Sequence, residues 1–199
     1  MKIKLILLIM LFSLSVIQAQ DKKTENDTLL IWSENRSIKW NDFLSKNKVK
    51  GYIHDDGLAT ISLSLAFFPK ELKCKDINSI KIIALMNKKR SWVGVEIKNG
   101  IKHEQLHFDI AELYARKMRR KLNYILSEDN KCDLQAIANM YKSLENEFWE
   151  FQFLYDNEVR IEGKEKINQQ KWNIKIDSLL TVYKDYKQDI YLEDIELNN

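Results

Sequence analysis

The residues best suited to chemistry are the run His103-Glu104-Gln105-Leu106-His107. On a helix His107 would lie about 40° from His103, so both imidazoles would project from one face and could share a metal ion. Neutral imidazole nitrogens suit Zn²⁺ well, and Glu104 is placed to take a proton from metal-bound water. The motif therefore predicts a zinc site with His103 and His107 as ligands and Glu104 as general base.

The rarity of this motif makes it informative. A chain of 199 residues should contain the pattern by chance in roughly one case in a hundred or fewer. Two of the three histidines in the sequence form it. The competing interpretation is a pair of surface histidines on an ordinary helix. The third histidine, His54, lies in the run YIHDDG and is expected to be a solvated turn residue.

A tetrahedral catalytic zinc needs a third protein ligand, and helix lengths limit where that ligand can lie. The first helix should run about 19 residues, roughly 28 Å, beyond His107, and the second, 134–155, about 21 residues, roughly 31 Å. An antiparallel return therefore ends level with the histidines. The carboxylates that follow this return are Asp156, Glu158 and Glu162. For any one of them, an ordinary polar loop remains the alternative.

Other polar residues of the first helix are expected to serve elsewhere. Asp109 and Glu112 point away from the two-histidine face, so they are candidates for supporting the metal ligands by hydrogen bonds or for forming ion pairs. The basic run RKMRRK, residues 116–121, is expected to form a solvated face near the helix C-terminus. No aromatic or glycine-rich recognition motif accompanies it, so a nucleic-acid partner is not expected.

The sequence around the motif predicts an α+β fold. Turn residues separate short β-rich runs at 29–33, 59–68 and 79–86, which predicts a small sheet between about 29 and 98. From Ile101 onward glycine appears once and proline never, and apolar residues recur at helical spacing. The active-site helix should therefore run from about 100 to 126 and be followed by two further long antiparallel helices, ending near 190. The connection between these two helices is expected at 156–163, and the third helix has its apolar positions between Trp172 and Ile190.

The N-terminus has the layout of a secretory signal peptide, because two lysines precede an apolar run that small and polar residues follow. Residues 1–20 should be removed, which leaves a single exported domain, periplasmic or secreted, at 21–199 with no stable membrane span. Loss of Lys2 and Lys4 would lower the formal charge from +3 to about +1, which gives no case for nucleic acid. In an oxidising compartment Cys74 and Cys132 could form one disulfide, and neither lies at zinc-finger spacing.

The longer string HEQLHFDIAELYARKMRRKL, residues 103–122, resembles a bacterial family of secreted zinc-dependent proteases catalogued as domain of unknown function 922. The motif of that family reads HEQxHFDIxExxAR. The runs RSIKWNDF, GLATIS and KKRSWV upstream, and YDNE and QQKWNIKI downstream, resemble other blocks of the family in the same order. The resemblance implies a zincin-like metallopeptidase with His103 and His107 as ligands and Glu104 as base.

This sequence departs from the family pattern at the third ligand. In similar sequences the downstream block reads YDxxTxHG, and its histidine would be the ligand. Alignment on Gly163 and Trp172 puts Glu162 in that place, and two histidines with a glutamate are a common catalytic set. The resemblance implies an exported zinc-dependent peptidase that acts on a peptide or protein substrate. The alternative is a non-catalytic exported binding module that retains a structural or vestigial metal site.

Overall fold

The computed structural model describes residues 23–47, 58–97, 99–129 and 132–196. The predicted signal peptide and His54 lie outside these ranges. The described chain combines helices with small antiparallel sheets, which confirms the predicted α+β class.

The strands form two small sheets. A three-stranded antiparallel sheet has the order β1-β4-β3, with β1 at Leu29–Ile31, β3 at Leu63–Phe68 and β4 at Lys81–Asn87. A separate two-stranded antiparallel sheet pairs β2 (Ala59–Thr60) with β5 (Trp92–Val93). Short 3-10 turns occupy Trp40–Asp42 (η1), Cys74–Ser79 (η2) and Lys88–Arg90 (η3).

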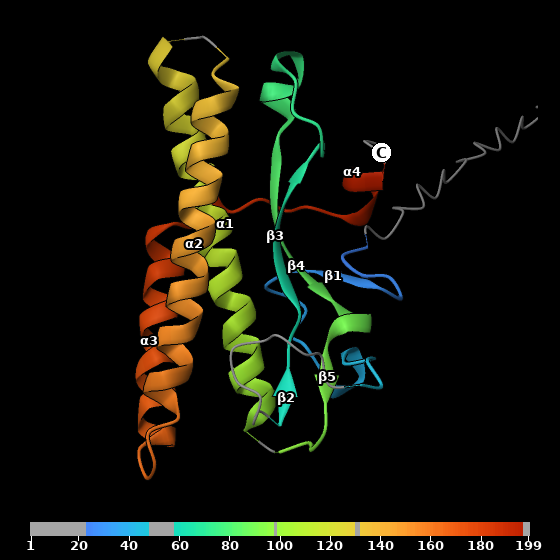
Figure 1. Cartoon of the computed structure of the whole chain (residues 1–199), viewed down its shortest axis with the longest axis vertical. Helices are drawn as coiled ribbons and strands as arrows, with labels where there is room; N and C mark the ends of the chain where they lie inside the picture. The colour runs from blue at the N-terminus through green and yellow to red at the C-terminus, as the bar shows by residue number, and fades with distance from the viewer. Residues whose placement is uncertain (1–22, 48–57, 98, 130–131, 197–199) are drawn as a thin grey trace, which may run out of the picture.

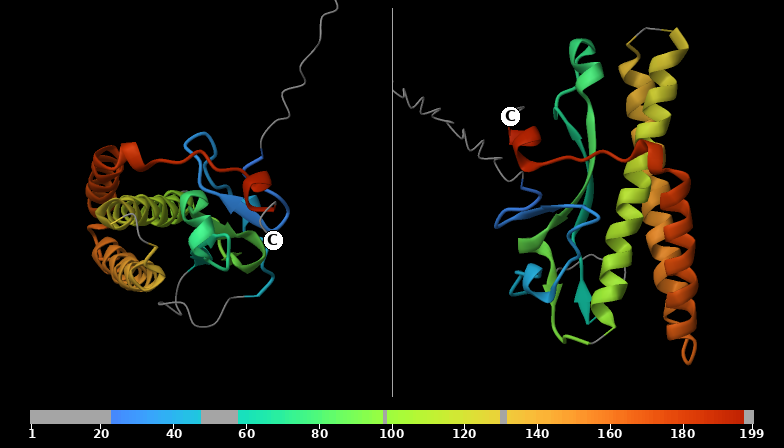
Figure 2. Two further views of the ribbon diagram at one scale, coloured as in Figure 1. Left: turned by 90° about the horizontal axis from the view of Figure 1, so that it is seen from above. Right: turned by 180° about the vertical axis from the view of Figure 1, so that it is seen from behind.

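Three long helices stand beside the sheet (Figure 1). The first, α1 (Gly100–Asp129), packs on β3 and β4 with one side and on α2 (Leu134–Val159) and α3 (Glu165–Val182) with the other. Figure 2, left, shows this order from above, with α1 between the sheet and the two outer helices. A helix in such a middle position must be apolar around most of its circumference. Accordingly, Phe108, Ile110, Leu113 and Met118 are all completely buried.

The predicted strand at 59–68 is divided in the structure. The chain leaves its first sheet partner at Ile61 and Ser62, where the Ser62 N–H donates to Ser91 Oγ at 2.9 Å and Ser62 O accepts from the Asn87 N–H at 2.8 Å. The division separates β2 from β3. As a result, β2 lies beside the N-terminal end of α1, the end that carries the two histidines (Figure 1).

The predicted boundaries of the outer helices are wrong in ways that matter for the site. The second helix continues to Val159, so Asp156 belongs to its last turn and not to a connection. The turn to α3 therefore lies at 160–164 and contains Gly163 with φ +76°, a left-handed conformation that glycine adopts without steric cost. The third helix begins at Glu165 and ends at Val182, before the predicted end near 190.

The C-terminal segment crosses the outer face of the sheet instead of extending α3 (Figure 1). After the turn η4 (Lys184–Tyr186) it ends in a short helix, α4 (Leu192–Glu196). Ile190, Leu192 and Ile195 are buried there against Phe68 and Ile83. The helix-like spacing of apolar residues beyond Val182 therefore belongs to a segment that packs across the sheet.

The basic run 116–121 is not a fully solvated face, contrary to the prediction. Arg116 and Arg119 are 2% and 4% exposed and both pair with Glu112 Oε1 at 2.9 Å. Arg119 also donates to the carbonyl oxygens of Ile82 and Tyr186, and therefore ties α1 to the sheet and to η4. The ion-pair prediction for Glu112 is confirmed.

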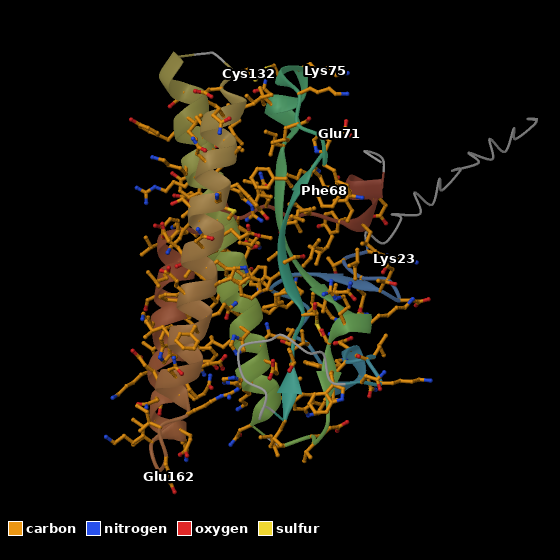
Figure 3. The ribbon with its side chains drawn as sticks, in the orientation of Figure 1. Lys23, Phe68, Glu71, Lys75, Cys132 and Glu162 are labelled. Atoms are coloured by element: carbon orange, nitrogen blue, oxygen red, sulfur yellow. A yellow bond between two sulfur atoms is a disulfide. The ribbon has the colours of Figure 1, made fainter. Side chains whose placement is uncertain are left out.

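Cys74 and Cys132 form a disulfide with a Cα–Cα distance of 5.4 Å. It connects η2 to the start of α2 at the end of the molecule opposite Glu162 (Figure 3). The bridge closes a sequence separation of 58 residues, which in the chain-entropy account stabilises the fold by about 4 kcal/mol. No helix within the described ranges is both long enough and apolar enough to cross a membrane.

Candidate metal centre

The two predicted histidines come together with one carboxylate. His103 and His107 lie one turn apart on α1, and their Nε2 atoms are 3.1 Å from each other. Asp156, from the last turn of α2, places Oδ1 at 3.0 Å from His103 Nε2 and 3.3 Å from His107 Nε2. Within the ranges that the structure describes, these three residues are the group of His, Cys, Asp and Glu side chains that could hold a metal ion.

The donor set fits a zinc ion in chemistry and in size. Two imidazole nitrogens and a carboxylate oxygen form a common catalytic zinc set. Ligand atoms about 2.0 to 2.1 Å from a tetrahedral zinc lie roughly 3.3 to 3.4 Å apart. The separations of 3.0 to 3.3 Å between these atoms are close to that value, so only small side-chain adjustments are required.

Gln152 fixes the orientation of the His107 ring. Its Oε1 accepts from His107 Nδ1, and its Nε2 donates to the His107 carbonyl oxygen at 3.0 Å. Gln152 is 3% exposed and lies one turn before Asp156 on α2, so both side chains leave the same face of the helix. With its Nδ1–H bonded to Gln152, His107 turns Nε2 toward Asp156 and His103, which is the position from which Nε2 could bind a metal ion.

Tyr155 holds the His103 ring from one side. The two rings are stacked with centroids 4.8 Å apart, and the Tyr155 ring meets His107 edge-on at 4.7 Å. The Tyr155 hydroxyl donates to Gln169 Oε1 on α3 at 2.8 Å. Burial raises the pKa of this hydroxyl well above its usual range, so it remains a neutral donor at physiological pH. Tyr155 therefore positions the histidines without changing the charge of the site.

The charges at the centre are complementary to a cation. Burial raises the pKa of Asp156, but hydrogen bonds from His103 and His107 outweigh it and hold the pKa far below its usual range. For His107, burial lowers the pKa, yet the bond to Asp156 raises it more. The carboxylate is thus ionised and favours a proton on His107. A bound metal ion would satisfy the same carboxylate in place of that proton.

Glu104 lies where the motif predicted, beside the ligand group. It is 6% exposed and lines the same cavity as His103, His107 and Asp156. The opposite wall of this cavity comes from β2 and the segment after it, through Ala59, Thr60, Ile61 and Leu63. The cavity therefore lies between α1, the last turns of α2 and the beginning of the divided strand.

The other two carboxylates considered as third ligand lie elsewhere. Glu162 is exposed in the turn between α2 and α3 and extends from the lower end of the molecule (Figure 3). Glu158 accepts a hydrogen bond from Trp172 Nε1 at 2.8 Å. Neither belongs to the group of converging ligand atoms. The structure therefore brings together His103, His107 and Asp156, the earliest of the three carboxylates in the sequence.

Asp109, which was predicted to point away from the two-histidine face, lies outside the cavity at the ligand group. It accepts hydrogen bonds from Trp32 Nε1 and Gln105 Nε2, each at 2.8 Å, and burial raises its pKa.

The sequence reasoning missed Gln152 and the positioning role of Tyr155. Gln152 interrupts an apolar stripe on α2, and a polar residue on a buried helix face is the signal that could have found it. Its partner could not be read from the sequence, because the bond to His107 depends on the relative rotation of two helices. Comparison of the chain with family models, with curated proteins and with solved structures finds no match.

Proposed function

We propose that this protein is an exported, zincin-like peptidase that hydrolyses peptide bonds with Zn²⁺ held by His103, His107 and Asp156. The observation that carries the proposal is the convergence of Asp156 Oδ1 with the two Nε2 atoms next to Glu104. Two surface histidines without a function would not need buried partners such as Asp156, Gln152 and Tyr155 to fix the orientation of their rings. The buried partners therefore favour a built site over an accidental one.

Asp156 takes the place of third ligand in this proposal, ahead of Glu162. Its Oδ1 already lies 3.0 and 3.3 Å from the two Nε2 atoms, whereas Glu162 is exposed in the turn beyond α2. The substitution that the resemblance suggested at Glu162 therefore need not abolish metal binding. The resemblance to the secreted protease family supports the same reaction class.

The residues of the chain have distinct tasks in the proposed reaction. When bound, zinc would acidify a water molecule and polarise the scissile carbonyl group. Glu104 accepts the proton of the attacking water and delivers it to the leaving amine. Gln152 keeps the Nε2 lone pair of His107 available, and Tyr155 keeps the His103 ring in place. The disulfide supports an oxidising compartment outside the cytosol.

Hydrolysis of a mixed peptide library by the zinc-loaded protein and by Glu104→Gln tests the proposal. We expect Glu104→Gln to bind zinc normally and to lose about 10² to 10⁴-fold in rate, because only the proton acceptor is removed. Glu147→Gln, an exposed carboxylate of α2, is the matched control and should keep full activity. If neither wild type nor Glu104→Gln hydrolyses any peptide, the proposed peptidase activity is contradicted and the non-catalytic binding module becomes the better explanation.

A further inference from the structure

A second and larger cleft adjoins the metal centre. Its volume is about 690 Å³, and it shares four lining residues with the cavity at the ligands. The shared residues are Ala59, His103, Glu104 and Arg160. The two spaces therefore adjoin, and a molecule in the larger one would lie beside the proposed reaction centre.

One wall of this cleft is apolar and exposed. Leu58, Val95 and Ile97 flank the two-stranded sheet of β2 and β5 and are 48%, 51% and 45% exposed. Trp40 extends the same wall. This wall approaches the helix start so closely that a Cβ at Gly100 would lie 2.7 Å from Ile97. Clustered exposed apolar side chains beside a reactive group are suited to an apolar substrate side chain.

The helical side of the same cleft is polar, and its cations outnumber its carboxylates by three to two. Lys102 from α1, Arg160 from the end of α2 and Lys166 from α3 line it, and its acidic lining residues are Glu104 and Glu165. Arg160 is the cation that also lines the cavity at the ligand group, with Nη2 at 3.7 Å from Asp156 Oδ1. Its position joins the cleft to the metal centre.

We propose that this cleft selects substrates that carry a carboxylate next to a bulky apolar residue, and that Arg160 binds the carboxylate. The apolar side chain would contact Leu58, Val95 and Ile97, while the planar guanidinium offers the fork that pairs with a carboxylate. The carboxylate has two possible sources, the C-terminus of a peptide or an Asp or Glu side chain. The inference rests on the proposed function, because it assigns the substrate of the same centre.

A different role for Arg160, stabilising the oxyanion, predicts different kinetics. An anchor for the substrate carboxylate changes KM and the preference between charged and uncharged peptides. A residue that stabilises the oxyanion acts on every peptide and lowers kcat without changing that preference. The preference is therefore the quantity to measure.

The test compares matched peptides that differ only in the carboxylate. All four peptides contain a leucine near the C-terminus. The first pair differs in the C-terminus, which is a free acid or an amide. The second pair has an amidated C-terminus and differs in one internal residue, which is glutamate or glutamine. Binding to the metal-free protein is measured by titration calorimetry, and hydrolysis is measured with the zinc-loaded protein. We expect one carboxylate peptide to bind at least about tenfold more tightly than its uncharged counterpart.

Arg160→Gln should reduce this preference to about twofold or less, and Arg160→Lys should retain part of it. Arg120→Gln, an exposed arginine of α1 outside the cleft, is the matched control and should keep the full preference. Thermal unfolding of each variant checks that it folds. The proposal is overturned if charged and uncharged peptides bind alike or not at all, or if Arg160→Gln keeps the wild-type preference. Selective binding without hydrolysis would refute the proposed peptidase activity and leave the proposed specificity of the cleft intact. Hydrolysis without a preference for the carboxylate would refute the specificity and leave the peptidase activity intact.

Discussion

Two groups of buried polar residues on α1 have opposite designs. Near the C-terminal half, Glu112 is surrounded by Arg116 and Arg119, and the arginines also donate to backbone carbonyl oxygens. Near the N-terminus, His103 and His107 direct ring nitrogens toward each other and toward one carboxylate oxygen. The hydrogen bonds of the first group connect elements of the fold, and the second group brings potential metal-ligand atoms to one point.

This contrast distinguishes structural from functional polar burial. Removing a charge from a buried, paired group leaves its partners uncompensated, so such a group is needed for stability. Ligand atoms that converge on one point can share a metal ion, which then replaces the proton that lies between them when no metal is bound. Changes in the two groups should therefore separate stability from metal binding.

The largest effect on stability is expected from Glu112→Gln. Loss of this carboxylate leaves Arg116 and Arg119 buried without their ion-pair partner, which should lower the free energy of unfolding by about 3 to 5 kcal/mol. Urea denaturation monitored by circular dichroism measures the change. Zinc affinity should stay within about twofold of wild type at temperatures where the variant is folded, because the group lies outside the metal centre. A normal stability would show that the cluster is not structural.

Gln152→Leu should have a smaller effect that falls on the metal. Without the bond from His107 Nδ1, the ring loses its fixed tautomer and orientation, so zinc affinity should fall about 10 to 100-fold. A chromophoric chelator in competition measures the affinity, and thermal unfolding without metal reports on the fold. Gln135→Leu, an exposed glutamine of α2, serves as control. An unchanged zinc affinity in Gln152→Leu would show that Gln152 does not orient His107 for metal binding.

The smallest effect is expected at a third polar group, on the surface near β1. Hydrogen bonds from Arg36, opposed by partial burial, and from Lys88 lower the pKa of Glu25 to about 2. A lowered carboxyl pKa stabilises the fold above the unfolded pKa, and this stabilisation is lost as the pH falls from about 4.5 to about 2. Because Glu25 is 36% exposed, we expect less than about 1 kcal/mol. The difference in unfolding free energy between wild type and Glu25→Gln, followed from pH 6 to pH 2, should shrink toward zero, and a constant difference would contradict it.

The parts of the molecule that the sequence predicted are those coded locally. His103, Glu104 and His107 share one turn of one helix, so their spacing alone places them together. Helix lengths brought Asp156 into the candidate set, but the end of α2 was placed too early, and Asp156 could not be separated from Glu158 and Glu162. The choice among these three depended on where a helix stops, which periodicity defines least well.

The features that were not predicted depend on contacts between distant segments. The burial of Arg116 and Arg119 follows from Glu112 one and two turns away together with carbonyl groups of α3, β4 and η4. The division of β2 from β3 follows from Ser91, which lies 29 residues from Ser62 in the sequence. Charge and hydropathy patterns do not reveal such partners. The sequence alone therefore predicts a solvated basic face at 116–121 and one continuous strand at 59–68.

The zinc affinity of Asp156→Asn compared with Glu162→Gln tests the central claim most directly. Both substitutions replace a carboxylate by an amide of nearly the same shape, one inside the converging group and one in the exposed turn. We expect Asp156→Asn to weaken zinc binding about 100-fold or more and Glu162→Gln to stay within about twofold of wild type. Wild-type affinity in Asp156→Asn, together with weakened binding in Glu162→Gln, would contradict it.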